Sequence, residues 1–255
     1  MKNNKISPLK ERPLHVAGQS LDEQIQNYIS EDVSMLLLIP ALLIVMTTTA
    51  WLTLAFPSKY FPIVVTIITL LAIIYCVNRL IILRKKIKSF VLGRKGERIV
   101  AEIFDNFRSQ GFVVFNDIVA ENFNIDHVIL TTHGIFTVET KTFSKPPKGE
   151  ITYKDEKIIA GNRNTGNEII LQAESQTKWL KSMLKDSTGR DYPVMPVIVF
   201  PGWFVQPMPE NLKKRIWILN PDALGSFIKN EPIRIHESEM HLAAFHISRY
   251  IRMYN

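Results

Sequence analysis

Two acidic residues and a lysine stand close together in a segment whose other residues are mainly apolar. Asp126 belongs to an Asn-Ile-Asp-His run, and Glu139 and Lys141 belong to the Glu-Thr-Lys triplet that follows a Thr-His-Gly turn. Two carboxylates about 4 Å apart repel by roughly 4 kcal/mol at an effective dielectric constant near 20. A proton, the Lys141 ammonium or a cation must offset that repulsion. Carboxylate oxygens without histidine or cysteine suit Mg²⁺ or Mn²⁺, which can activate a water and stabilise charge on a phosphoryl oxygen.

The position of the hairpin loop decides whether these side chains meet. If Thr132-His133 is a two-residue loop, Asp126 lies opposite Glu139; if His133-Gly134 is the loop, Asp126 lies opposite Lys141. Both registers bring the three side chains together, because Glu139 and Lys141 share one face of a strand. A three-residue loop without a bulge would place Asp126 on the other face. The competing interpretation is a cross-strand salt bridge on a solvated sheet.

The neighbours of Asp126 indicate a strand that is covered on both faces. Val128 and Leu130 share the face of Asp126, whereas His127 and Ile129 occupy the opposite face. Charged groups on such a strand are costly unless they pair or bind a ligand. His127 is therefore predicted to be a histidine of the core rather than a metal ligand.

Two further polar residues are candidates for the same site. Glu97 lies on the helical stripe of Val100 and Phe104, so it is predicted to point inward. It could equally be an acid near a helix N-terminus, which the macrodipole stabilises. Gln172 lies on a later helix, with Gln176 one turn further on. A glutamine at such a position can also simply cap a helix or face water.

The hydrophobic pattern predicts an α/β domain with a central sheet covered by helices. A helix around residues 99–107 ends at Gly111, and helical periodicity returns in three later segments. Apolar runs between the helices predict strands, two of which form a second, more exposed hairpin. The predicted strands are 112–119, 125–130, 135–141, 149–153, 157–160, 195–200 and 215–219, and the later helices are 169–184, 220–228 and 237–253.

Two long segments before this domain are nearly free of charge. Residues 34–57 and 60–78 contain no charged side chain, and each is close to the roughly 20 residues that cross a bilayer as a helix. They predict transmembrane helices at about 34–56 and 60–82, joined by a turn at 57–59. The alternative is a buried helical pair in a soluble protein. Small polar residues at 47–50 suit helix packing and could support a homo-oligomer.

Basic residues after the second helix predict the orientation in the membrane. They outnumber those of the connecting turn, which has only Lys59, so the positive-inside rule places both termini in the cytoplasm. The expected organisation is a cytoplasmic segment 1–33 with a short amphipathic helix, membrane helices within 34–83, and a cytoplasmic domain at 89–255. The amphipathic helix could lie on the membrane or pack on the domain. The basic residues are Arg79, Arg84, Lys85, Lys86, Lys88, Arg94 and Lys95.

The net charge of +7 is weak evidence for a nucleic-acid partner, because lipid headgroups are the expected partner of that basic cluster. The lone cysteine, Cys76, falls in the second apolar segment. It allows neither an intrachain disulfide nor a cysteine-based metal site.

Three motifs follow one another along the chain: Gly-Arg-Lys-Gly-Glu at 93–97, Ile-Asp-His at 125–127 and Gly-Ile-Phe-Thr-Val-Glu-Thr-Lys at 134–141. Together they resemble the nuclease-related domain family, NERD. The resemblance covers about Phe90 to Leu184. It departs from the family pattern at Tyr153, where tryptophan is common, and at Asn167-Glu168, where Asn-Pro is common.

The resemblance implies a fold and an activity. NERD domains are assigned to the PD-(D/E)XK nuclease superfamily, so a restriction-endonuclease-like fold is expected. By motif position, Asp126 and Glu139 would bind Mg²⁺ or Mn²⁺, Lys141 would be the catalytic lysine, and Glu97 and Gln172 would complete the catalytic set. The expected activity is hydrolysis of phosphodiester bonds, with DNA favoured over RNA. The alternative is an inactive, membrane-tethered module that binds nucleic acid or protein.

Overall fold

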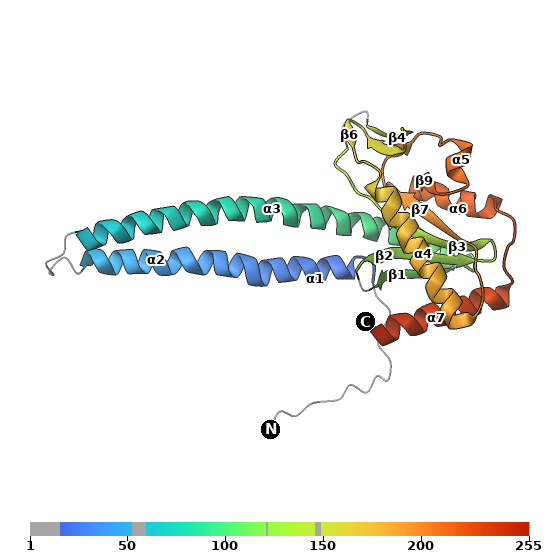
Figure 1. The fold of residues 1–255 in the computed structure, drawn as a ribbon, viewed down its shortest axis with the longest axis horizontal. Coiled ribbons are helices and arrows are strands. Elements are labelled where there is room, and N and C mark those ends of the chain that lie inside the picture. The colour runs from blue at the N-terminus through green and yellow to red at the C-terminus, as the bar shows by residue number, and fades with distance from the viewer. Residues whose placement is uncertain (1–15, 53–59, 121, 146–148, 255) are drawn as a thin grey trace, which may run out of the picture. The chain divides into compact units, whose positions relative to one another are not determined.

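The computed structural model describes residues 16–52, 60–120, 122–145 and 149–254 (Figure 1). The chain divides into two compact units, one formed by Ser20–Leu92 and the other containing Gly93–Asn255 together with the residues up to Gln19. The predicted turn at 57–59 lies outside the described residues.

The first unit is helical. Helix α1 (Gln19–Asn27) and a π-helical stretch (Tyr28–Val33) precede α2 (Ser34–Leu52) and α3 (Tyr60–Arg108). The part of α3 from Gly93 onward belongs to the second unit. Only 6% of the residues in the apolar window of the first helical run are buried, and 11% in that of the second. By length and composition both could cross a membrane. Their apolar side chains therefore do not form the core of the described fold.

Helix α3 is longer than the sequence pattern indicated. A membrane helix ending near residue 82 and a separate helix around residue 99 were expected, whereas α3 continues to Arg108 without interruption. The intervening residues contain no proline, and isolated glycines such as Gly93 and Gly96 cost only about 1 kcal/mol each in a helix. Glycine at 96 also suits the packing, since a Cβ there would lie 1.8 Å from Thr142 Oγ1.

Polar contacts join α2 to the apolar half of α3. Thr47 Oγ1 lies 2.5 Å from Thr69 Oγ1, and Trp51 Nε1 donates to Thr66 Oγ1 at 3.0 Å. Thr47 and the buried Ala50 thus pack within the hairpin, while Thr48 and Thr49 are exposed. Of the small residues at 47–50, Thr47 and Ala50 thus serve packing between two helices of one chain.

The second unit contains a five-stranded sheet of order β1-β2-β3-β7-β9. The first three strands are antiparallel, and β3, β7 and β9 are parallel. This mixed sheet with its helices confirms the α/β class. The strands are β1 (Val113–Val119), β2 (Asn124–Thr131), β3 (Gly134–Thr140), β7 (Val194–Val199) and β9 (Trp217–Leu219).

A smaller sheet of order β6-β5-β4-β8 flanks the first. Its hairpin β4–β5 matches the predicted exposed hairpin. The two outer strands have two residues each, too short for any hydrophobic pattern to show in the sequence. The strands are β4 (Glu150–Lys154), β5 (Lys157–Ala160), β6 (Arg163–Asn164) and β8 (Phe204–Val205).

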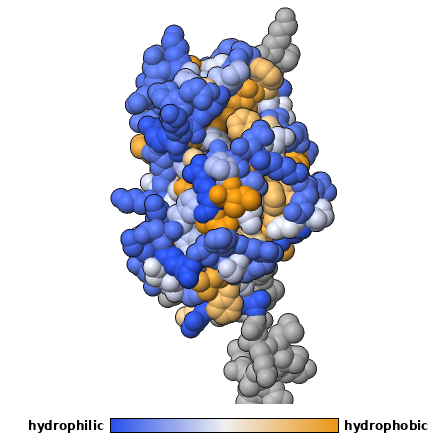
Figure 2. All heavy atoms as spheres, turned by 90° about the vertical axis from the view of Figure 1, so that its right-hand side faces the viewer, coloured by the Kyte–Doolittle hydropathy of each residue, from blue (hydrophilic) through white to orange (hydrophobic). Residues whose placement is uncertain are grey.

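Helices cover both faces of the large sheet. Leu180 of α4 packs with Val128 and Leu130 of β2, whereas Phe104 of α3 packs with Ile129 on the opposite face. The prediction of a central strand covered on both faces is therefore confirmed. One face of this unit is mainly hydrophilic, with apolar residues in small groups (Figure 2). The later helices are α4 (Glu168–Thr188), α5 (Glu210–Lys213), α6 (Pro221–Asn230) and α7 (Glu237–Tyr254).

Candidate active site

The β2–β3 turn sets the register of the candidate residues. Thr131 pairs with Gly134, so Thr132-His133 is the two-residue loop. Continued past the last pair, His127 with Val138, this register places Asp126 opposite Glu139. Gly134 has φ +145°, a region that favours glycine, and a Cβ there would approach Pro193 O to 3.3 Å. The first of the two favourable registers is therefore the one adopted.

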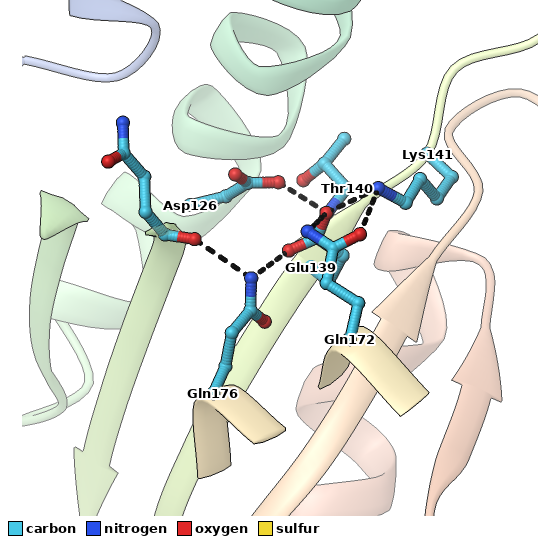
Figure 3. A network of polar contacts seen from close by, with 7 residues as sticks. Asp126, Glu139, Thr140, Lys141, Gln172 and Gln176 are labelled. Carbon is cyan, nitrogen blue, oxygen red and sulfur yellow. Dashed lines mark hydrogen bonds and ion pairs between the residues drawn. The ribbon is translucent and has the colours of Figure 1, made fainter. Parts of the chain in front are cut away.

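Glu139 is the centre of a polar network (Figure 3). Its side chain is buried at the end of β3, and its Oε1 accepts from Lys141 Nζ at 2.5 Å and from Gln172 Nε2 at 2.8 Å. Its Oε2 accepts from Gln176 Nε2 at 2.6 Å. Gln172 Oε1 also accepts from Lys141 Nζ at 3.0 Å. Two successive turns of α4 thus fix the carboxylate, and Gln172 links it to the ammonium.

Gln176 contacts Glu139 directly, although the sequence analysis named it only as the neighbour of Gln172 one helical turn away. It is 1% exposed, whereas Gln172 is exposed to solvent. Gln176 Nε2 also donates to Asn124 O at 2.8 Å, which joins α4 to the start of β2. The four-residue spacing from Gln172 was the available signal, because residues one helical turn apart lie on one face.

Asp126 lies beside the network, and its surroundings disfavour a negative charge on its carboxyl group. Its Oδ2 accepts from the backbone N–H of Thr140 at 2.7 Å. Burial, followed by the negative charges of Glu139 and Glu97, raises the pKa of the Asp126 carboxyl well above its usual value. The Thr140 N–H and Lys141 oppose that rise without cancelling it. A proton or a cation is therefore needed to compensate this half-buried acid.

Glu97 reaches the same group of acids from α3. It is 8% exposed, and burial together with Asp117 and Glu139 raises its pKa from 4.5 to about 8. The alternative that Glu97 is a helix N-terminal acid is wrong, because α3 begins at Tyr60 and Glu97 lies far along it. Its inward direction was predicted correctly from the stripe of Val100 and Phe104.

Asp117 is an acid that the sequence analysis did not single out. It is 2% exposed, lies between the pairs Asn116–His127 and Ile118–Ile125 of the β1–β2 ladder, and has φ +50°. Asn124 Nδ2 donates to its Oδ1 at 3.3 Å. The available signal was an aspartate within an apolar strand, a position that β-propensity disfavours.

His127 lies on the opposite face of β2, as predicted. It is fully buried, its Nδ1 lies 2.9 Å from Asn116 Oδ1, and its ring meets Phe104 edge-on at 5.2 Å between centroids. Burial lowers the pKa of His127 from 6.5 to about 3, so the ring is neutral at physiological pH.

The donor set fits a hard divalent cation, with one restriction. Asp126 and Glu139 offer carboxylate oxygens, and a cation would offset the repulsion that raises the pKa of Asp126. Within the described residues, no three His, Cys, Asp or Glu side chains are arranged to hold a metal ion. Mg²⁺ commonly uses one or two carboxylates and completes its shell with water and substrate phosphates. The fit therefore rests on the pair Asp126 and Glu139.

A comparison with protein families supports a nuclease-related assignment for this part of the chain. Residues 92–201 match the family described as NERD, the nuclease-related domain. The match includes every residue of the site, from Glu97 to Gln176. Searches of curated proteins and of solved structures found no match.

Proposed function

We propose that this protein is a membrane-anchored nuclease whose site hydrolyses phosphodiester bonds with Mg²⁺ or Mn²⁺. The observation that carries the proposal is the buried Glu139, held by Lys141 and two glutamines opposite Asp126. The match of residues 92–201 to the nuclease-related domain supports the same chemistry. The proposed fold class is the restriction-endonuclease-like one, and DNA is the favoured substrate.

The chain's own groups have distinct tasks in this proposal. Asp126 and Glu139 would hold the cation, which when bound supplies Lewis-acid polarisation of the phosphoryl group. Lys141 would orient a phosphate oxygen, since its ammonium already lies at the edge of the site. Gln172 and Gln176 keep the Glu139 carboxylate in one orientation, which lowers the reorganisation needed when substrate binds. Glu97 would tune the charge of the group.

The full-length chain in detergent tests the activity. Single- and double-stranded DNA and RNA are incubated with Mg²⁺ or Mn²⁺, and cleavage is compared for the wild type, Asp126→Ala and Glu139→Ala. Lys185→Ala serves as a control, because this exposed lysine pairs with Asp191 away from the site. The nuclease proposal fails if the wild type cleaves nothing, or if the two acid variants cleave as well as the control.

We further propose that α2 and the apolar part of α3 span the membrane, with both termini in the cytoplasm. The exposed apolar side chains of both helices and the basic residues that follow position 78 support this. In a Cys76→Ser background, Lys59→Cys and Ser182→Cys should react with a membrane-impermeant maleimide from opposite sides of sealed vesicles. Labelling of both from the same side would reject the orientation.

One observation favours a second candidate function. Both oxygens of Glu139 already accept hydrogen bonds from side chains of the chain, and no three-ligand metal group is present in the described residues. An inactive module that binds nucleic acid or a protein partner would be compatible with such a site. Salt-sensitive binding to DNA that survives Glu139→Ala, without any cleavage by the wild type, would support it.

A further inference from the structure

A polar cavity of about 530 Å³ adjoins the candidate site. Three segments line it: the chain after β3, the strand β6 with its following turn, and the first two turns of α4. Lys141 and Gln172 form the wall shared with the site, and Phe143, Arg163 and Glu168 lie further along the lining. Its volume falls within the range of small-molecule sites, about 300–1,000 Å³.

The cavity is directly connected to the proposed chemistry. Lys141 and Gln172 belong to its lining, and both donate to Glu139 Oε1. A group that enters the cavity therefore approaches the same ammonium that Glu139 holds. In a nucleic-acid strand, a phosphate next to the one at Lys141 would need a neighbouring cationic side chain.

Arg163 has the position for that contact. Its guanidinium carbon lies 4.8 Å from the centroid of the Phe143 ring, and Phe143 packs on Phe200 at 5.9 Å between centroids. A cation–π contact with the ring restrains the guanidinium, and the five N–H groups of a guanidinium remain available as donors to an anion. Among the described residues, no acidic side chain forms an ion pair with Arg163. Its charge is thus not neutralised within this part of the chain.

Hydrogen bonds fix the backbone of the segment that carries Arg163. Arg163 pairs with Ala160 in the β5–β6 ladder, and Thr165 Oγ1 donates to Ile158 O at 2.8 Å. In the same turn, the backbone N–H of Gly166 donates to Asn164 Oδ1 at 2.9 Å. These contacts place an arginine on an ordered turn, which reduces the entropy lost when it binds a ligand.

We propose that this cavity binds a backbone phosphate of a single DNA strand, next to the phosphate that is cut, and that Arg163 donates to its oxygens. The inference rests on the proposed nuclease function, since it names a substrate-binding residue for the same site. Glu168 would have the opposite effect to Arg163 and would weaken phosphate binding. Glu168 is the acid of the cavity's lining and lies in the first turn of α4, so its charge disfavours a phosphate there.

Binding of a 5′-fluorescein-labelled single-stranded DNA 20-mer to the full-length chain in detergent tests the proposal. Fluorescence anisotropy is measured in EDTA, between 50 and 300 mM salt, so that cleavage does not interfere. Arg163→Ala should weaken binding about tenfold at 100 mM salt. It should also reduce the slope of log K against log[salt] by about 0.7, the value for one phosphate contact on a single strand. Arg163→Lys should retain most of that slope.

Two further variants make the result specific to the cavity. Lys157→Ala removes a positive charge from an exposed position of the same small sheet, outside the cavity, and should change the dissociation constant less than twofold. Glu168→Gln should tighten binding about twofold, because it removes the like charge. Equal effects of Arg163→Ala and Lys157→Ala, or no binding by the wild type, would overturn the proposal.

Cleavage assays separate this inference from the nuclease proposal. If the wild type cleaves DNA and Arg163→Ala cleaves with unchanged KM, the cavity is not a phosphate site, although the nuclease function stands. If the wild type cleaves nothing but Arg163→Ala loses affinity and salt slope as described, the nuclease function fails and the phosphate site stands. When both hold, Arg163→Ala raises KM about tenfold and changes kcat less than threefold.

Discussion

Strand β2 carries two neighbouring titratable residues into opposite surroundings. Asp126 faces Glu139 and Glu97, and its pKa is raised by burial and by their charges. His127 faces Phe104 and Asn116, and burial alone lowers its pKa to about 3. Burial favours the neutral form of both side chains, but only the face of Asp126 brings several charged groups together. Burial by itself therefore does not mark the candidate site, and the collection of like charges on one face does.

The largest expected effect is the loss of cleavage when the acids on the Asp126 face of the sheet are replaced. If the proposed nuclease function holds, Glu139→Gln and Asp126→Asn should lower the cleavage rate by about 10²–10³, since a cation bound by these acids would supply several kcal/mol of transition-state stabilisation. Asp126→Asn should leave the melting temperature in EDTA unchanged or higher, because asparagine cannot acquire the negative charge that the surroundings of Asp126 disfavour. Single-turnover cleavage and thermal unfolding are measured on the same samples. A variant that loses activity only because it unfolds would contradict the assignment.

The acid face is the face of β2 on which Asp126 meets Glu139 and Glu97. It should also determine how stability changes at alkaline pH. The pKa of Glu97 is about 8 in the folded chain, against 4.5 without its surroundings, so the folded state binds this proton more tightly. The stabilisation is complete below pH 4.5 and is lost as pH rises through 8. In EDTA the melting temperature should fall by roughly 10 °C over that window, for a loss of a few kcal/mol. Glu97→Gln should flatten the profile; an unchanged slope would mean that another group titrates.

The opposite face of β2, which carries His127, should instead lose stability as pH falls. The folded-state pKa of His127 is below its ordinary 6.5, so the stability it contributes is present above pH 6.5 and is lost as pH falls toward 3. His127→Phe should remove that acid-side loss. At neutral pH it should cost about 1–3 kcal/mol, since Asn116 Oδ1 loses its partner. Cleavage should remain within threefold of the wild type at a temperature where both are folded; a 100-fold loss would place His127 in the site.

The two faces were predictable from the sequence because they depend on local rules. Strand alternation separates Asp126 from His127, and the two-residue loop fixes the hairpin register. The stripe of Val100 and Phe104 gave the direction of Glu97. Asp117 was missed because its position opposite Asp126 and its φ of +50° depend on the β1–β2 pairing. β1 and β2 are joined by a short turn, with Val119 opposite Asn124, but the sequence analysis assigned no register to that hairpin.

The few elements of the fold that the sequence did not predict depend on features that its local patterns do not show. Strands β6 and β8 have two residues each, and β8 pairs with β4 across a long stretch of chain. The cavity beside Lys141 exists only because β6 and α4 come together there. The continuity of α3 was missed because the membrane helix was predicted to end soon after the apolar segment, although basic residues and isolated glycines do not by themselves stop a helix.

The smallest expected effect tests whether Asp117 belongs to the acid face. Its charge is the first of the neighbouring charges that raise the pKa of Glu97. Asp117→Asn removes that charge, and asparagine tolerates a positive φ at least as well as aspartate, so the backbone should keep its conformation. The midpoint of the alkaline fall in melting temperature should move to lower pH, with the acid-side slope of His127 unchanged. Asp117→Ala adds backbone strain and should lower stability at every pH, so it controls for a purely structural effect. If the midpoint stays where it is in Asp117→Asn, the acid that acts on Glu97 is Glu139 of β3, and Asp117 of β1 does not belong to the acidic group.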